Sequence, residues 1–252
     1  MPYNPLQLSE ETERLVTQGL LRRYYRAARP GRWYGGIASA DCCGCNLRCV
    51  LRWSGAPRDS PGEIGRFYSP LEIFKSLTAC ARRFGYRQLR VSGNEPIIGK
   101  EHLLNLLELI DQTHYKFILE TNGILIGHDP DYARQLSRFK CVHVRVSIKV
   151  TDPQEFSRLT GAVPEAFDLQ LKALDNLLAA GVPCHPAVML SFSPEENFNK
   201  LVKRLREIDS GLAEEVEEEY VFLYPHVVTQ LSRAGIKPRV AYEPDRVPKE
   251  LV

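Results

Sequence analysis

The chain has 252 residues, enough for one large domain or two small ones, and 44% of them are hydrophobic and 25% charged. This composition is typical of globular proteins, and no apolar run approaches the roughly 20 residues that a membrane-spanning helix needs. Residues 1–16 lack the basic patch and apolar stretch of a secretory signal, so we expect a cytoplasmic protein without a membrane partner. The net charge of +2 is too small to indicate a partner by itself.

The first distinctive segment is basic and aromatic. No acidic residue lies between Arg14 and Asp41. Arginine among aromatic side chains is typical of sites that bind phosphate or RNA, whereas a basic run alone more often forms a solvated helix and its connection. We expect a helical, basic extension over residues 1–32, with RNA as the weaker candidate partner. The residues concerned are Arg22, Arg23, Arg26, Arg29, Arg32, Tyr24, Tyr25, Trp33 and Tyr34.

Strand and helix patterns then alternate along the chain. The clearest helix signal follows Ser69, where Pro70 suits the first helical position and Glu72 completes a capping box. Period-2 and helical-period runs predict the remaining elements. Strands are expected at 34–40, 86–93, 115–123, 141–150, 182–192 and 218–225, and helices at 69–85, 100–112, 129–139, 152–159, 164–181 and 193–209.

Six strands separated by helices indicate right-handed crossovers and a parallel sheet, either doubly wound or part of a barrel. In both architectures, ligands collect at the carboxyl ends of the strands. Polar and reactive residues are concentrated there, in "VSGNEP", "LETNG", "VSIK", "MLSFS" and "FLYPH". We therefore expect a domain over residues 33–225 with its site at this end of the sheet, followed by a tail over 226–252.

Four of the seven cysteines lie within the eight residues "CCGCNLRC", after the first predicted strand. Two residues separate Cys42 from Cys45, and three separate Cys45 from Cys49. An odd, clustered set of cysteines favours metal binding over disulfides, and thiolates suit iron–sulfur clusters and zinc. The other three cysteines stand alone and are expected to be buried apolar thiols; they are Cys80, Cys141 and Cys184.

The segment "GCNLRCVLRW" resembles the cluster loop of the radical SAM superfamily, whose motif is CxxxCxxC. Cys45 and Cys49 match its first two cysteines, and the third falls on Arg52, which cannot ligate iron. "SGNEP" resembles the GGEP motif of that family, "ETNG" the third-strand end in the activating-enzyme branch, and "RVSIK" the fourth-strand segment that meets the cofactor. The resemblance covers residues 33–225 and implies an α/β fold, a partial (β/α)6 parallel barrel.

The same resemblance implies an enzyme that uses a 4Fe–4S cluster and S-adenosyl-L-methionine. Reductive cleavage of that cofactor would give a 5′-deoxyadenosyl radical, which abstracts hydrogen from a substrate. An external electron donor such as flavodoxin or ferredoxin is implied as a partner. The substrate, a protein or a small molecule, is not legible in the sequence, and no residue is assigned to catalysis.

The missing third ligand leaves three interpretations open. Cys42 can replace it, because Cys42, Cys45 and Cys49 keep the same overall span in the order CxxCxxxC. Alternatively, the chain is a cluster-deficient, non-catalytic descendant that binds an adenosyl ligand or a partner. In the third interpretation, Cys42 belongs to the ordinary loop of the family for another reason and only Arg52 is aberrant. A protein of another class would use Cys42, Cys45 and Cys49 to hold a structural zinc ion.

The resemblance assigns a first group of cofactor-binding residues to the turn after the second strand. The backbone around Gly93 and Asn94 would receive the methionine amine of the cofactor, with Glu95 beside it and Pro96 fixing the turn. A buried carboxylate requires a partner, and a cationic amine is a suitable one.

A second group of cofactor-binding residues lies on the next two strands. Ser147 and Lys149 share one face of their strand, where Lys149 would meet the methionine carboxylate and Ser147 the ribose. Arg145, on the same face, is a candidate substrate contact, and Glu120 and Asn122 would line the same opening.

Overall fold

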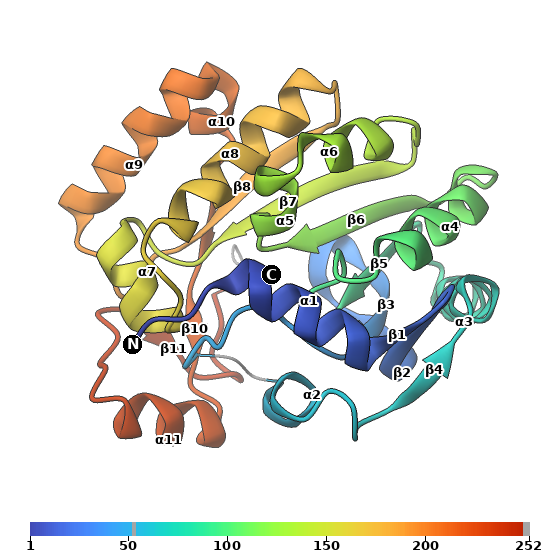
Figure 1. Ribbon diagram of the computed structural model, residues 1–252, viewed down its shortest axis with the longest axis horizontal. Helices are drawn as coiled ribbons and strands as arrows, with labels where there is room; N and C mark the ends of the chain where they lie inside the picture. The colour runs from blue at the N-terminus through green and yellow to red at the C-terminus, as the bar shows by residue number, and fades with distance from the viewer. Residues whose placement is uncertain (52–53, 249–252) are drawn as a thin grey trace.

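The computed structural model describes residues 1–51 and 54–248 (Figure 1). Six parallel strands lie side by side in one sheet, in chain order, and the last of them forms its edge. This arrangement confirms the predicted α/β fold with a partial parallel barrel. The strands are β3 (Ile37–Cys42), β5 (Gln88–Ser92), β6 (Lys116–Thr121), β7 (Val142–Ile148), β8 (Cys184–Met189) and β9 (Glu217–Glu219).

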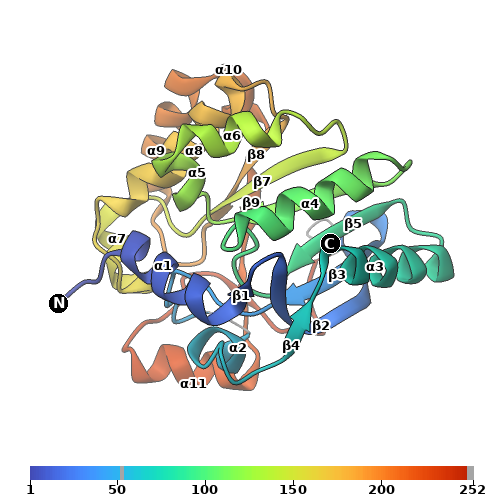
Figure 2. The ribbon, with the colours of Figure 1, turned by 45° about the vertical axis from the view of Figure 1, so that its right-hand side comes forward.

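Helices connect the parallel strands and cover one side of the sheet (Figures 1 and 2). The predicted capping box is present, since Ser69 accepts from the Glu72 amide and the Glu72 carboxylate accepts from the Ser69 amide. The helices are α3 (Pro70–Phe84), α4 (Lys100–Asp111), α5 (Ile124–His128), α6 (Pro130–Leu136), α7 (Pro153–Thr160), α8 (Ala166–Ala179), α9 (Glu195–Ile208) and α10 (Ser210–Glu214).

The two faces of the sheet differ in chemistry. Along β7, Val144, Val146 and Ile148 are fully buried in the hydrophobic core. The alternate residues Arg145 and Ser147 point to the opposite, inner face, because successive side chains of a strand alternate. The outer face therefore packs against the helices, and the inner face is free to carry polar chemistry.

The basic N-terminal segment corrects a prediction. Helix α1 (Pro5–Val16) ends early, and residues 21–31 form a strand, β2 (Leu21–Gly31), instead of a helix or its solvated connection. β2 runs antiparallel to β3 and carries β1 (Thr17–Gln18) and β4 (Arg66–Tyr68). Without it, β3 would present unpaired backbone groups, and a local pattern cannot reveal such pairing with a remote strand.

The C-terminal segment also contains regular structure. Strands β10 (Val221–Phe222) and β11 (Ala241–Tyr242) form a parallel pair, and helix α11 (Pro225–Arg233) lies between them in the chain. In Figures 1 and 2, α11 lies beside the short helix α2 (Gly55–Asp59), away from α6 and α9. A 3-10 turn (Trp33–Gly35) leads into β3. The proposed division at residues 32 and 225 stays a prediction. In the described part of the chain, no helix has the length and apolarity required to cross a membrane.

A buried histidine joins α4 to β2. His102 is 2% exposed; its Nδ1 lies 2.9 Å from the Leu20 carbonyl oxygen and its Nε2 lies 3.0 Å from the Tyr24 hydroxyl. A carbonyl only accepts, so Nδ1 carries the hydrogen and the neutral ring accepts from Tyr24. Burial, with a weaker contribution from the charge of Arg22, lowers the pKa of His102 from 6.5 to about 4.

This shift predicts acid sensitivity. Between pH 6.5 and 4 the unfolded chain binds a proton at His102 that the folded chain does not, so stability falls as the pH falls through this window. Lowering the pH from 7 to 5 should cost about 2 kcal/mol at this residue. Urea unfolding at both pH values should show a smaller pH-dependent loss in His102→Gln than in the parent. An equal loss in the two proteins would contradict the assignment.

Candidate functional site

Two adjoining cavities lie on the inner face of the sheet. The narrow pocket, of about 120 Å³, is at the carboxyl ends of the central strands, and the wide cleft, of about 920 Å³, opens beside it. The narrow pocket brings together seven of the eight residues predicted to bind a cofactor, and Pro96 is not part of its lining. These seven are Gly93, Asn94, Glu95, Glu120, Asn122, Ser147 and Lys149.

The turn after β5 is tied to the end of β6 by a buried carboxylate. Glu95 is 2% exposed. It accepts hydrogen bonds from the Thr121 hydroxyl at 2.7 Å and the Asn122 amide at 2.9 Å. Gly93 has φ of +90°, and a Cβ there would lie 2.9 Å from the Tyr25 hydroxyl. The turn therefore needs glycine at this position and a carboxylate two residues later.

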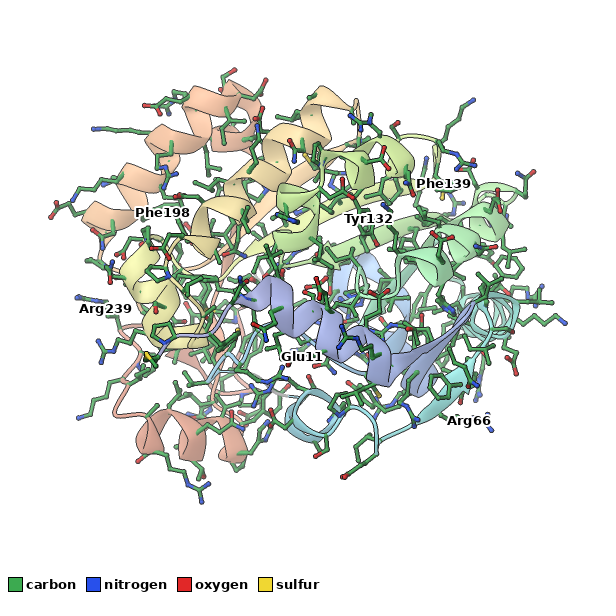
Figure 3. All side chains as sticks on the ribbon, in the orientation of Figure 1. Glu11, Arg66, Tyr132, Phe139, Phe198 and Arg239 are labelled. Carbon is green, nitrogen blue, oxygen red and sulfur yellow. The ribbon has the colours of Figure 1, made fainter. Side chains whose placement is uncertain are left out.

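Further hydrogen bonds from other segments of the chain hold the turn after β5. The Asn94 amide group donates to the Cys42 carbonyl at 2.9 Å, and the Ser54 hydroxyl donates to the Gly93 carbonyl at 2.5 Å. Tyr132, which extends from α6 (Figure 3), donates its hydroxyl to the Ile97 carbonyl at 3.0 Å. The turn is thus fixed before any ligand binds.

The end of β7 carries a chain of polar contacts. Lys149 Nζ donates to the Ser147 hydroxyl, which donates to Glu219 at 2.8 Å. Arg145 precedes Ser147 by two residues on the same strand, and its side chain is 8% exposed. Its guanidinium group lies 2.7 Å from Glu217 and 3.1 Å from Glu219. Burial by itself lowers the pKa of Arg145, but Glu219 and Glu217 raise it well above its ordinary value.

The carboxylates of Glu217 and Glu120 are held in the ionised form. Burial by itself raises the pKa of Glu217, but hydrogen bonds from Arg145 and His185 lower it to about 2. Burial by itself also raises the pKa of Glu120, but the charges of Arg90 and Arg145 lower that pKa below its ordinary value. Ion pairs therefore neutralise most of the inner face.

A buried glutamine that the sequence analysis missed joins β6 and β7. Gln170 of α8 is fully buried and donates to the Asn122 carbonyl at 2.8 Å and the Ser147 carbonyl at 2.9 Å. Its side-chain oxygen accepts from the Lys149 amide at 3.4 Å. A polar residue within the apolar stripe of 164–181 was the available signal, because a buried amide requires partners.

Both ends of the chain contribute residues to the wide cleft that the sequence analysis did not place there. The 3-10 turn before β3 contributes Tyr34, whose hydroxyl donates to Glu120 at 3.0 Å. The C-terminal segment contributes aromatic side chains. The lining residues from β2, the 3-10 turn and the C-terminal segment include Arg26, Arg29, Trp33, Tyr34, Tyr220, Phe222 and Tyr224.

The clustered cysteines are all buried but have different surroundings. Burial raises the pKa of the Cys42 thiol to about 12. The charge of Arg22 and a hydrogen bond from the backbone amide of Asn94 act in the opposite direction and lower that pKa. The Cys43 thiol donates to the Ile64 carbonyl at 3.3 Å. Cys45 and Cys49 lie further along the same loop. Of the isolated cysteines, Cys141 and Cys184 are buried as expected, whereas Cys80 is only partly buried.

Tyr3 anchors the cysteine loop, and the sequence analysis missed it. Its hydroxyl accepts from the Arg48 amide at 2.8 Å and donates to the Thr160 carbonyl at 2.9 Å. Burial raises the pKa of Tyr3, and the nearby thiols of Cys49 and Cys45 raise it further. The phenol therefore lies under the two cysteines that match the cluster motif.

The residues present fit a cluster in part. Two donors, the Asn46 side-chain amide within the loop and the Tyr25 hydroxyl beside Gly93, are buried without a partner among the described residues, as expected where an acceptor group binds. Within residues 1–51 and 54–248, however, no three His, Cys, Asp or Glu side chains are grouped to hold a metal ion. The set Cys42, Cys45 and Cys49 therefore stays a prediction, and Arg52 lies outside the described residues.

Relatives of known name share part of this chain. A probable GTP 3′,8-cyclase of Methanosarcina acetivorans is 30% identical over 155 residues, which are 60% of this chain and 44% of that protein. The GTP 3′,8-cyclase of Heliobacterium modesticaldum is 30% identical over 119 residues, 46% of this chain and 34% of that protein. The chain thus spans less than half the length of these relatives.

Solved structures share the fold. Streptococcus suis SuiB bound to S-adenosylmethionine superposes with a TM-score of 0.53 at 17% identity, covering 79% of this chain and 47% of that one. A spore photoproduct lyase mutant with bound AdoMet superposes with a TM-score of 0.53 at 17% identity, covering 79% of this chain and 60% of that one. The sequence profile of the Radical SAM superfamily matches residues 41–205. The chain therefore belongs to the radical SAM superfamily, whose enzymes use a 4Fe–4S cluster and S-adenosylmethionine.

Proposed function

We propose that this chain reductively cleaves S-adenosylmethionine and uses the radical formed to abstract hydrogen from a substrate held in the wide cleft. One observation carries the proposal: residues from three strand ends converge on one narrow pocket that adjoins a cleft large enough for a second molecule. When bound, the cluster would supply the electron that cleaves the cofactor to methionine and a 5′-deoxyadenosyl radical. An external donor such as flavodoxin or ferredoxin would replenish that electron.

In this proposal, each residue around the narrow pocket binds a different group of the cofactor. Lys149 binds the methionine carboxylate, and Ser147 binds the ribose. The backbone at Gly93 and Asn94 receives the methionine amine, with Glu95 held beside it. A preformed turn lowers the entropy cost of binding, because its groups are already ordered.

The proposed ligands of the cluster are Cys42, Cys45 and Cys49. Cys43 is less suitable, because its thiol is directed to the Ile64 carbonyl. For Cys42 to join the other two, its thiol must leave the Asn94 amide and lose its proton. The nearby Arg22 assists that loss, since its charge favours the thiolate.

The test of this ligand set is Cys42→Ala. Protein purified without oxygen and reconstituted with iron and sulfide should hold about four irons per chain. Cys42→Ala should lose this iron and the release of 5′-deoxyadenosine on addition of a reductant. The partly buried Cys80, remote from the loop in α3, provides the control, and Cys80→Ala should keep both.

Other outcomes identify the competing interpretations. A Cys42→Ala protein that keeps its cluster would show that Cys42 is not a ligand. A parent protein with one zinc ion and no iron would indicate a structural zinc site. A parent that holds neither metal but binds S-adenosylmethionine would be a non-catalytic descendant of the superfamily.

A further inference from the structure

Most charges in the wide cleft are already paired within the protein. Arg90 lies 2.6 Å from Glu120, with 6% of the Arg90 side chain exposed. Arg145 is shared by Glu217 and Glu219 at 2.7 and 3.1 Å. These closed pairs have little charge to offer a ligand, because a ligand would have to displace a buried partner.

One wall of the cleft is different, because the carboxylate of Asp41 faces two guanidinium groups there. Asp41 is fully buried, and Arg29 binds both of its oxygens at 2.7 and 3.0 Å. Arg26 lies 3.6 Å from the same carboxylate, and 52% of its side chain is exposed. Among residues 1–51 and 54–248, this wall therefore carries more positive than negative charge, and the exposed Arg26 is positioned to bind a further anion.

Aromatic rings line the same cleft as these two guanidinium groups. Trp33 and Phe222 stack with their ring centroids 6.1 Å apart and their planes 17° from parallel. Their faces and edges, with that of Tyr224, contribute flat apolar surface to the lining. Such surface suits a ligand with a flat ring, which gains by stacking as well as by burial.

Tyr34 is held in the cleft by a strained backbone. Its φ of +56° makes it the single non-glycine residue with a positive φ among the described residues. Gln88 donates to the Tyr34 carbonyl at 2.7 Å, and the Tyr34 hydroxyl donates to Glu120 at 3.0 Å. Strain of this kind persists where neighbours fix a side chain for function, and here it directs a phenol into the cleft.

We propose that the wide cleft binds a small molecule that combines a flat ring with an anionic group, either a carboxylate or a phosphate. Arg26, supported by Arg29, binds the anion, and the ring lies against Trp33 and Phe222. The proposed function makes this ligand the substrate, so its role as substrate rests on that proposal. A cleft of about 920 Å³ has the size of a small-molecule site, whereas RNA would need a groove that follows its backbone over several nucleotides.

Binding can be measured on the full chain without cofactors. The probes are benzoate and phenyl phosphate, with inorganic phosphate as the ringless anion and benzyl alcohol as the neutral ring, each titrated by NMR. We expect one ring anion to bind more tightly than both comparison probes. The better of benzoate and phenyl phosphate identifies carboxylate or phosphate as the preferred group.

Three variants assign the contacts. Arg26→Gln should weaken binding of the ring anion about tenfold, as expected for one charge-assisted hydrogen bond, and Arg26→Lys should restore much of it. Trp33→Leu should weaken the ring anion but leave inorganic phosphate unchanged. Arg83→Gln, on the exposed face of α3, is the matched control and should bind as the parent does. Thermal midpoints should show that all variants fold.

Equal affinity in Arg26→Gln and Arg83→Gln would overturn the proposal, and so would an RNA oligonucleotide that binds through Arg26 when no small anion does. S-adenosylmethionine cleavage is assayed separately. If cleavage fails while ring anions still bind through Arg26, the proposed function is wrong and the binding site stands. If cleavage succeeds and no ring anion binds, the inference alone fails.

Discussion

Cys45→Ala should remove the iron of the reconstituted protein and abolish cleavage of S-adenosylmethionine. Cys45 opens the segment that matches the superfamily motif and is fully buried above Tyr3. Changes in residues that merely support a metal ligand already cost about 10- to 100-fold in affinity or activity, so loss of a ligand should cost at least roughly 100-fold. Iron content, visible absorbance and 5′-deoxyadenosine yield measure the effect.

The fold should survive this substitution. Cysteine and alanine are similar in size, and a substitution of this kind typically costs about 1 kcal/mol. The metal-free forms of Cys45→Ala and the Cys80→Ala control should therefore unfold at similar temperatures, while their iron contents differ. Equal iron in the two variants would show that Cys45 is not a ligand and would remove the basis for a cluster in this loop.

Gln170→Leu should produce the largest loss of stability. Leucine nearly preserves the volume but leaves the carbonyls of Asn122 and Ser147 buried without a donor. Each such group costs about 1–3 kcal/mol, so a loss of roughly 2–4 kcal/mol is expected. In a protein of this size, that loss corresponds to a fall of roughly 5–15 °C in the melting temperature.

The same substitution should weaken cofactor binding, because Gln170 also contacts the Lys149 amide and sets the spacing of the two strand ends. Gln154→Leu, at an exposed position of α7, is the control and should change neither property by more than a small amount. Calorimetry of the metal-free protein measures stability, and titration with S-adenosylmethionine measures binding. A Gln170→Leu protein as stable as this control would contradict the bridging role.

Several features of the fold followed from the sequence because their causes are local. Ser69 and Glu72 lie three residues apart, so their capping box needs no partner elsewhere in the chain. The alternation of Val144 and Val146 with Arg145 and Ser147 assigns the two faces of β7 in the same way. Strand ends of a parallel sheet meet at one edge, which is why residues near 94, 121 and 148 could be expected to share one pocket.

The clustered cysteines show where this kind of prediction ends. Their spacing indicated a metal site and a family, and both the profile match and the fold agree with that family. Their side-chain directions depend on contacts from remote segments, such as the Asn94 amide beside Cys42. Spacing alone could not distinguish a thiol directed to the loop from one directed to the neighbouring strand.

The sequence by itself determined the alternation of strands and helices along the central part of the chain, the capping box of α3, the edge of the sheet that carries the site and the superfamily. Only the tertiary structure decided that the basic segment is a strand, that Gln170 bridges two strand ends and that Tyr3 supports a loop by bonding to Thr160, 157 residues away. It also decided that Arg26 faces a cleft lined by residues from the other end of the chain. Periodicity and capping act between near neighbours, whereas these contacts depend on which surfaces pack together once the sheet has closed.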